Sequence, residues 1–544
     1  MHLLVDSTQW DSPEIGRFFV GEKLRILGGY SNFAAKFCTI MKKVVYVFVA
    51  LWAMVCLQGC TGSSELEQMI PSDAIGVMVV DVPAIVDNAG LQADGKLSLP
   101  ESLRQVLDES EGSALATVLT DLPRLGLDLD AKAYGFMTEK TYATVWIAAL
   151  SDSEQARLTL SRGFGADFSE ADGLQCLYQG DYLCAISDDI LMVGRFNRPV
   201  EKDKAVKAAK NILLKKNPKA IDDERLKEVL RSDVAFRARL NRLALQSALR
   251  RSAGYRKVVE KMPLIELFTQ SDLEAVDLQI TLAAEKANLT LHIEAGEQSD
   301  YNKLLSMLLT QPSADVLKAI PNSMDYVLSM SVKGERLVNL PQVSMMLKSL
   351  DGMPYMNRLN LSGLLSLIDG SVAVAVGEDP HLKGEWNAVF SARTTASEQI
   401  IKQISLFASL LGQAPEVWNG EYIYQYDNKM IKLGTLDSGV LYGKMLDYDQ
   451  PEASLYDKAD IRKRFETCAV SFYARSKRGV LNFGLTDHFN GTGEFTAKES
   501  GAALGLLETL CLIGGSNAYD DMFDQAEELD SSVGVAIDQL HPME

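Results

Sequence analysis

The sequence predicts an α+β fold of two tandem homologous halves, each a largely antiparallel sheet with packed helices. Three observations favour it: short segments recur in the same order 236 to 250 residues apart, strand-like segments follow one another in runs, and single helical segments separate the runs. A doubly wound sheet would instead show regular alternation of strands and helices. A lipoprotein signal peptide is expected to precede the two halves.

Four pairs of segments carry the repeat. Because their order is the same in both halves and their offset drifts slowly, we expect a duplicated unit with insertions. We place the first unit at 70–315 and the second at 316–515. The pairs are Ile70–Val82 with Ile320–Val332, Ser153–Leu160 with Ser397–Ile404, Asp188–Arg195 with Asp437–Lys444, and Asp233–Arg239 with Ala469–Arg475.

Each unit is expected to open with a buried strand after Ile-Pro. A helix, further strands, a Ser-Glu-Gln helix, a hairpin, a half-buried strand, and a last hairpin and helix then follow. The segments are helices at Pro100–Leu119 and Pro341–Leu350, strands at Tyr142–Leu150 and Gly370–Glu378, turns at Gln179–Asp181 and Asp427–Lys429, an alternating strand at Asp233–Asn241, a tight turn at Asn490-Gly491, and a helix near Ala502–Leu512.

The first unit carries a basic helical insertion at about 200–275. Residues 201–261 hold 18 Lys and Arg against 8 Asp and Glu, in a chain whose net charge is −19. Two interpretations stay open: the block docks on an anionic surface, or it pairs with the acidic body. The tail at 516–544 has eight acids and no Lys or Arg, which is typical of a disordered, solvated end.

The N-terminal region predicts lipid anchoring. Met41-Lys42-Lys43 is a basic start, and the 14 apolar residues Val44–Leu57 fit a signal-peptide core but are short for a membrane span of about 20 residues. Leu57-Gln58-Gly59-Cys60 resembles a bacterial lipobox, which predicts cleavage between Gly59 and Cys60 and lipidation of Cys60. The alternative is a buried apolar helix with a chance cysteine.

The lipobox assigns 41–59 to the signal peptide and 60–69 to a tether. Residues 1–40 are interpreted as upstream sequence translated from too early a start, with a genuine N-terminal extension as the alternative. The membrane is therefore the first expected partner, through the N-terminal lipid.

Cys176 and Cys184 flank the first-unit hairpin symmetrically about Gly180. They either form a disulfide across the strands or pack as free thiols. The cysteines left after processing are too few for a disulfide framework in a chain of this size.

Trp418, Tyr422, Tyr424 and Tyr426 stand at even positions of one strand-like segment. On a single strand they would share a face and form a platform for sugar rings or for an apolar partner. The same row is typical of an ordinary packed sheet face.

The sequence holds no His-Glu-x-x-His, no Gly-x-Ser-x-Gly, no phosphate-binding loop and no Cys-x-x-Cys. We therefore predict no metal site, no cofactor and no catalytic set. Whether the protein is an enzyme stays open, with a non-enzyme favoured.

The lipobox, the opening strand Ile70-Pro71-Ser72-Asp73-Ala74 and the repeat together resemble a family of uncharacterised Bacteroidetes envelope lipoproteins, a domain of unknown function. The resemblance covers nearly all of Ile70–Gly515 and implies a place in the cell envelope and an architecture. It implies no activity and no catalytic residues. The second copy departs from the motif at Asn322-Ser323-Met324.

Together these observations predict a lipid-anchored, non-catalytic binding or scaffolding protein of the cell envelope. The alternative is an envelope hydrolase, glycan-directed, using a pair of carboxylates. An envelope protein or glycan is the expected partner, and nucleic acid is not. Thr61 follows Cys60 in place of the Asp that retains enterobacterial lipoproteins in the inner membrane, which favours the outer membrane.

Overall fold

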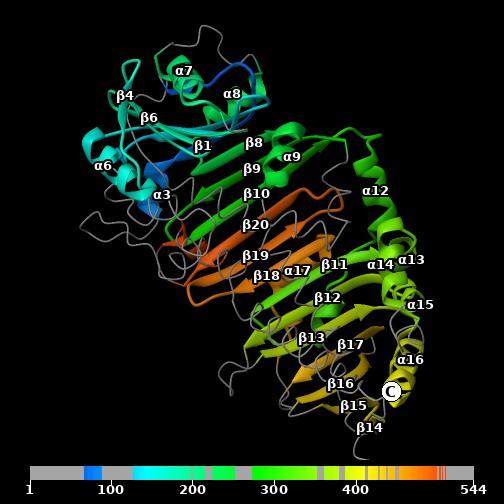
Figure 1. Ribbon diagram of the computed structural model, residues 1–544. Helices are drawn as coiled ribbons and strands as arrows, with labels where there is room; N and C mark the ends of the chain where they lie inside the picture. The colour runs from blue at the N-terminus through cyan, green and yellow to red at the C-terminus, as the bar shows by residue number, and fades with distance from the viewer. Residues whose placement is uncertain are drawn as a thin grey trace, which may run out of the picture.

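The sheet dominates the structure, a computed structural model that describes residues 66–88, 126–197, 200–214, 223–251, 272–351, 360–378, 386–410, 414–426, 429–436, 439–446, 453–498 and parts of 501–509. Twenty strands from these residues form one open sheet (Figure 1). Every neighbouring pair in it is antiparallel. The prediction of an α+β fold with a largely antiparallel sheet is therefore confirmed.

The strands follow one continuous order across the sheet. From one end to the other they are β4 (Ser169–Ala171), β5 (Leu174–Gln179), β6 (Tyr182–Ser187), β7 (Ile190–Phe196), β3 (Tyr142–Ala149), β2 (Lys132–Thr138), β1 (Ala74–Asp81), β8 (Phe236–Asn241), β9 (Leu273–Leu282), β10 (Lys286–Ala295), β20 (Gly491–Ala497), β19 (Gly479–Leu485), β18 (Val470–Arg475), β11 (Tyr326–Lys333), β12 (Asp369–Glu378), β13 (Trp386–Arg393), β17 (Val440–Leu446), β16 (Lys429–Leu436), β15 (Glu421–Tyr426) and β14 (Glu416–Trp418).

The sheet consists of two runs of strands in the same order. Read inward from β4, the first run follows the same sequence of connections as the second run read inward from β14, so that β4 corresponds to β14, β7 to β17, β3 to β13 and β10 to β20. The two runs meet in the middle, where β10 pairs with β20 and green strands lie beside orange ones in Figure 1.

The four recurring sequence pairs lie on β1 and β11, α6 (Ser153–Phe164) and α16 (Ser397–Leu410), β7 and β17, and β8 and β18. These are equivalent strands and helices in the two runs, but the register of two of the sequence pairs is shifted. Strand pairing matches Asn241, and not Arg239, with Arg475, and it matches Gly194 with Lys444. Common ancestry of the halves stays a prediction.

Successive residues of a strand point to opposite faces, so the sheet has two faces. The α6 face carries Met78 and Val80, on which α6 packs through Ala156, Leu160 and Phe164. The α7 face carries Val77 and Val79. In the first half it is covered by α7 (Lys202–Leu213) and α8 (Glu224–Leu230), two of the predicted basic helices, whose buried residues include Ala205 and Leu226.

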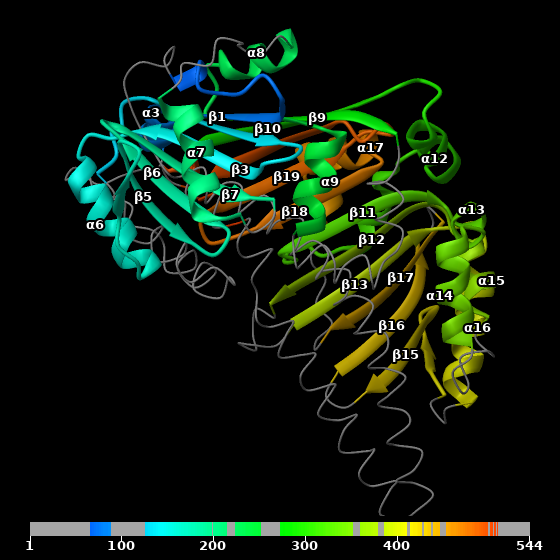
Figure 2. The same ribbon diagram turned by 45° about the horizontal axis from the view of Figure 1, so that its top comes forward.

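The second half uses the same faces. On the α6 face, α15 (Leu361–Ser366) and α16 pack against Leu441. On the α7 face, a short helix at Ala314–Ala319, another at Leu455–Asp457 and α17 (Ala459–Thr467) cover Val327 and Val389. Other helices are α3 (Val82–Asn88), α9 (Arg242–Arg251), α12 (Asp300–Leu308), α13 (Gly334–Val338) and α14 (Pro341–Asp351), and α12 to α16 line one side of the sheet (Figures 1 and 2).

Local sequence explains several element ends. Asp152 caps α6 by accepting a hydrogen bond from the Gln155 amide at 2.9 Å, and Gly165 ends the helix at a φ of 62°. The predicted helix at Pro341–Leu350 is α14, whereas the one at Pro100–Leu119 lies outside the described residues. Within the described part of the chain, no helix combines the length and hydropathy needed to cross a membrane.

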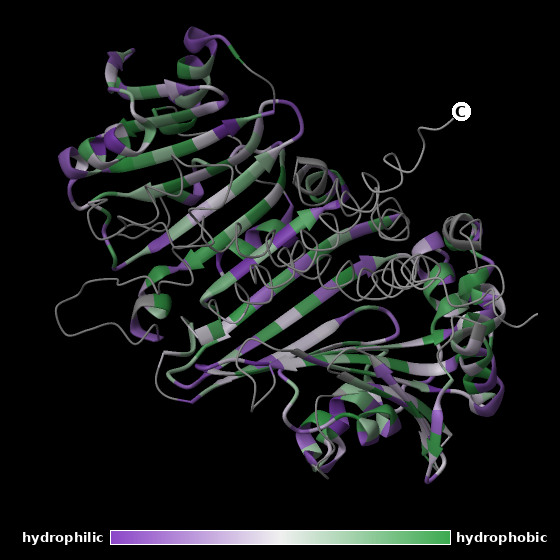
Figure 3. Ribbon diagram, turned by 60° about the horizontal axis from the view of Figure 1, so that its bottom comes forward, coloured by the Kyte–Doolittle hydropathy of each residue, from purple (hydrophilic) through white to green (hydrophobic). Residues whose placement is uncertain are grey.

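Apolar and polar bands alternate along the strands (Figure 3). The α7 face is apolar under its helices but polar on the central strands. Arg237, Arg239, Asp277, Glu294 and Glu494 all lie on this central part. The polar stripe separates the two apolar clusters of this face and leads to the candidate site.

Candidate functional site

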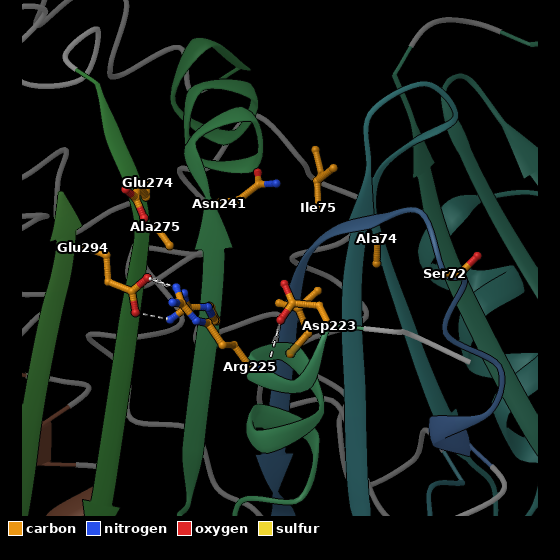
Figure 4. A pocket seen from close by; sticks show the side chains of 11 residues that line it. Ser72, Ala74, Ile75, Asp223, Arg225, Asn241, Glu274, Ala275 and Glu294 are labelled. Carbon is orange, nitrogen blue, oxygen red and sulfur yellow. Dashed lines mark hydrogen bonds and ion pairs between the residues drawn. The ribbon is translucent and has the colours of Figure 1, made fainter. Parts of the chain in front are cut away.

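A polar pocket lies at one end of this stripe, between the start of β1, the ends of β8 and β10, and α8 (Figure 4). Its volume is about 300 Å³. The lining residues are Ser72, Ala74, Ile75, Asp223, Arg225, Leu226, Arg239, Asn241, Glu274, Ala275 and Glu294. Five of them carry a formal charge.

Glu294 is the centre of the pocket's hydrogen bonds. Arg239 binds both of its oxygens, Nη1 to Oε1 at 2.8 Å and Nη2 to Oε2 at 2.5 Å. Arg225 donates from Nη1 to the same Oε2 at 2.8 Å. The hydrogen bonds from Arg239 hold the pKa of Glu294 below its usual value, and burial opposes this shift. Glu294 therefore stays ionised at neutral pH.

A second arginine pair supports the first. Arg237 donates to Asp277, Nε to Oδ1 at 3.2 Å and Nη2 to Oδ2 at 3.0 Å, and the hydrogen bond to Asp277 raises the pKa of Arg237. Arg239 lies 3.8 Å from the same Asp277. Each acid is thus paired with a bidentate arginine, the arrangement that fixes side-chain geometry best.

The corresponding place in the second half is filled. Gly76 pairs with Leu240 and Tyr326 pairs with Ala474, so Asp325 and Arg475 stand where Ile75 and Asn241 stand in the first half. Arg475 donates from Nε to Asp325 Oδ1 at 3.0 Å.

Arg475 also closes the loop before β11. Its Nη1 donates to the carbonyl of Asn322 at 3.2 Å, and its Nη2 donates to the carbonyl of Ser323. In the first half, the short Asn241 and the uncharged Ile75 leave this space open, which explains why the pocket forms there.

The pocket is suited to binding rather than to proton transfer. A general acid needs a carboxyl whose pKa is raised, and the pKa of Glu294 is lowered. No group of three or more potential metal ligands occurs among the residues that the structure describes. The separation of Arg239 from Glu294 in sequence, 55 residues, gave no local signal for this site.

The predicted cleavage and lipidation site, Gly59 and Cys60, lies outside the described residues. Their predicted roles stay predictions. The same holds for 1–40, for the signal peptide and for the acidic tail.

The disulfide considered for Cys176 and Cys184 does not form, and both thiols are free. Cys176 pairs with Ala185 and Cys184 with Leu177, so the thiols point to opposite faces of the sheet. The hairpin turns on two residues, Gly180 and Asp181, and not on Gly180 alone, which shifts the register by one. Burial raises the pKa of Cys176 to about 11 and that of Cys184 to about 12.

The predicted aromatic platform is split by a turn. Asn419 and Gly420 have positive φ angles of 52° and 83°, which fits a two-residue hairpin turn between β14 and β15. Trp418 therefore pairs with Glu421, and points to the α7 face, while Tyr422 and Tyr424 point to the α6 face.

The tyrosines that face α16 are packed. Tyr424 is 6% exposed and its hydroxyl lies 2.8 Å from Ser405 Oγ of α16, while Tyr422 packs on the cluster around Leu441. The side chain of Tyr426 lies outside the described residues. The four residues do not form one platform, and Trp418 is 66% exposed apart from the tyrosines. The Asn-Gly pair was the sequence signal for this turn.

Trp418 lies beside a charged group on the α7 face. Tyr442 donates its hydroxyl to Glu421 Oε1, and Lys432 Nζ lies 3.8 Å from Glu421 Oε2. Lys432 is buried, with its side chain only 8% exposed. The Lys444 ammonium lies 5.0 Å from the centre of the Tyr442 ring.

Neither a family model nor a curated protein matches the chain. Solved structures that resemble it include three crystal forms of TP0453. Form I has 13% identity and a TM-score of 0.27, and covers 45% of this chain and 86% of that one. Form III has 14% identity and a TM-score of 0.24, and covers 44% of this chain and 84% of that one. Form IV has 13% identity and a TM-score of 0.22, and covers 41% of this chain and 78% of that one. Likeness at these TM-scores supports no inference.

Proposed function

We propose that the protein is a lipid-anchored protein of the cell envelope whose folded part is a non-catalytic binding or scaffolding module. The observation that carries the binding role is the clamp on Glu294. Its two oxygens accept hydrogen bonds from Arg225 and Arg239. These bonds fix the charged side chains that line the pocket, and they keep Glu294 ionised, so that it is not suited to donating a proton.

The lipobox at Leu57–Cys60 supports the anchoring. A diacylglycerol on the Cys60 thiol and an acyl chain on its freed amine would give the two or more chains that stable anchoring needs. We place the protein in the outer membrane, and the shared strand order of the two runs supports a proposed origin of the halves by duplication.

The second half suggests what the pocket binds. There Arg475 holds two backbone carbonyls and one carboxylate of the chain's own loop at 322–325. The open first-half pocket, lined by Arg225 and Arg239, is suited to a segment of an envelope protein partner that offers similar groups. A hydrolase with a carboxylate pair remains the alternative, and the lowered pKa of Glu294 gives it no support.

Anchoring is tested by replacing Cys60 in the full chain. Cys60→Ala should move the protein from the detergent phase to the aqueous phase in a phase-partition assay and abolish labelling with a radioactive fatty acid. Cys468→Ala is the matched control, because this cysteine is buried in the fold. Unchanged labelling in Cys60→Ala would contradict the anchor.

The pocket is tested by filling it with its second-half counterparts. A photo-crosslinking residue at Ser72 should capture a protein partner in isolated envelopes. The double substitution Ile75→Asp with Asn241→Arg should abolish that crosslink. It should also lower the free energy of unfolding by about 1 kcal/mol or somewhat more, because Asn241 Oδ1 accepts a hydrogen bond from the Ala244 amide at 2.9 Å and Ile75 packs on the cluster around Leu240. A circular dichroism spectrum like that of the wild type checks that the variant is folded. A crosslink that survives the filled pocket would contradict this binding site.

A further inference from the structure

We propose that the β14–β15 hairpin binds a pyranose ring of a neutral envelope oligosaccharide. Trp418 would stack on the ring, and Glu421 would accept hydrogen bonds from its hydroxyls. The inference rests on the binding role proposed above but concerns a different place, at the far end of the sheet from β4.

The hairpin places Trp418 directly opposite a polar residue. The two-residue turn at Asn419-Gly420 fixes the strand ends, and Trp418 pairs directly with Glu421. With 66% of its surface exposed, Trp418 is the most exposed large hydrophobic residue among the described ones. Trp is enriched at binding interfaces because its large ring supplies apolar contact area, and here the ring stands opposite a carboxylate that hydrogen bonds hold in place.

The carboxylate beside it is held in one orientation. Tyr442 binds one oxygen and Lys432 faces the other, so Tyr442 and Lys432 are positioning residues. The Tyr442 ring passes over Gly434, where a Cβ atom would lie 2.5 Å from the tyrosine oxygen. Glu421 itself keeps 30% of its side chain exposed and is the group that a ligand can reach.

This chemistry favours a neutral, hydroxyl-rich ring over other ligands. An apolar protein or lipid surface would have to remove water from Glu421 without replacing its hydrogen bonds. An anion would meet the Glu421 carboxylate in a chain of net charge −19. A cation would compete with Lys432, which already lies 3.8 Å from that carboxylate. A sugar offers an apolar ring face to Trp418 and donors to Glu421.

The test is a titration of the purified full chain with two neutral tetrasaccharides, one of β-1,4-linked glucose and one of β-1,4-linked N-acetylglucosamine. Binding is followed by tryptophan fluorescence and by saturation-transfer NMR. Trp418→Ala should weaken it at least about tenfold, and Glu421→Gln about fivefold. Val417→Ala is the matched control, because Val417 is 62% exposed on the same strand but faces the other side.

Saturable binding of either sugar that falls in Trp418→Ala and stays within about twofold in Val417→Ala supports the proposal. No saturable binding of either sugar would overturn it, as would binding that Trp418→Ala leaves unchanged. Tetralysine serves as the cationic arm, and binding of tetralysine with none of the sugars would also overturn it. Capture of a partner by the crosslinking residue at Ser72 in the same chain would confine the failure to this inference, because that crosslink tests the proposed binding role separately.

Discussion

The two halves share an order of strands, yet each leaves exposed a part of the sheet that is covered or filled in the other half. In the first half α7 covers the outer strands, while the space beside Asn241 is a pocket. In the second half Arg475 fills that space, while Trp418 and Glu421 are exposed on the outer strands. The comparison teaches that one scaffold can present two different surfaces when helices and single side chains are exchanged.

On the outer strands, the register of the pairing shows which residues of the two halves are equivalent. Leu183 lies opposite Gly194, which pairs with Val145, and Lys432 lies opposite Lys444, which pairs with Val389. Val145 and Val389 each stand eight residues before the matching Ser-Glu-Gln. Leu183, buried under α7, and Lys432 thus occupy equivalent places.

Exchanging these two residues should give the largest effect. Leu183→Lys puts an unpaired ammonium into the apolar cluster under α7, and we expect a loss of about 3–5 kcal/mol in the free energy of unfolding. Lys432→Leu should cost about 1 kcal/mol, because Glu421 stays partly in water. Urea unfolding measures both. Equal costs would break the comparison of the two ends.

The split aromatic row predicts the next largest difference. Tyr424→Ala removes a buried ring and its hydrogen bond to Ser405, which should cost about 3 kcal/mol. Trp418→Ala removes an exposed ring and should change the free energy of unfolding by less than about 0.5 kcal/mol. Thermal unfolding of both variants distinguishes them. A costly Trp418→Ala would mean that Trp418 is packed.

The pocket predicts a pH dependence. Because hydrogen bonds from Arg239 lower the pKa of Glu294 in the folded state, the ionised carboxylate stabilises the fold above its usual pKa of 4.5, and this stabilisation is lost as the pH falls through the lowered pKa. In Glu294→Gln, unfolding midpoints should therefore depend less on pH below 4.5. Glu274→Gln, at the same pocket, is the control and should keep the wild-type dependence.

The smallest effect concerns the two free thiols of the first half. With pKa values of about 11 and 12, Cys176 and Cys184 should react very slowly with a thiol reagent at pH 8, and rapidly once urea unfolds the chain. Reduction should leave their alkylation pattern unchanged. A disulfide-linked peptide joining them would contradict the register of this hairpin.

Much of the sheet could be predicted because its strands carry local signals. The segments at 142–150 and 370–378 were each readable from a few neighbouring residues. The tight turn predicted at Asn490-Gly491 was wrong, because Gly491 opens β20 opposite Leu485 and the chain turns at Thr486–Phe489, where the Phe489 amide donates to the Thr486 carbonyl at 3.0 Å. The face of Trp418 could have been predicted too, since Asn419-Gly420 is a tight-turn signal. Counting even positions across that turn put Trp418 on the wrong face.

The pocket could not be predicted in this way. The pocket depends on which of several acidic residues forms an ion pair with Arg239. Glu294 is that residue because the register of β8, β9 and β10 brings it next to Arg239. In the second half, the equivalent space is filled by the ion pair between Asp325 and Arg475, which are 150 residues apart in the sequence. Neither contact leaves a pattern in a short stretch of sequence.

The most direct test of the central claim is hydrogen exchange of the lipidated protein, measured in isolated envelopes and in detergent. The account predicts that amides of the hairpin at 416–423 exchange more slowly in envelopes, where a ligand is present, while those of the equivalent hairpin at 169–176 are unchanged. Equal behaviour of the two hairpins would contradict it.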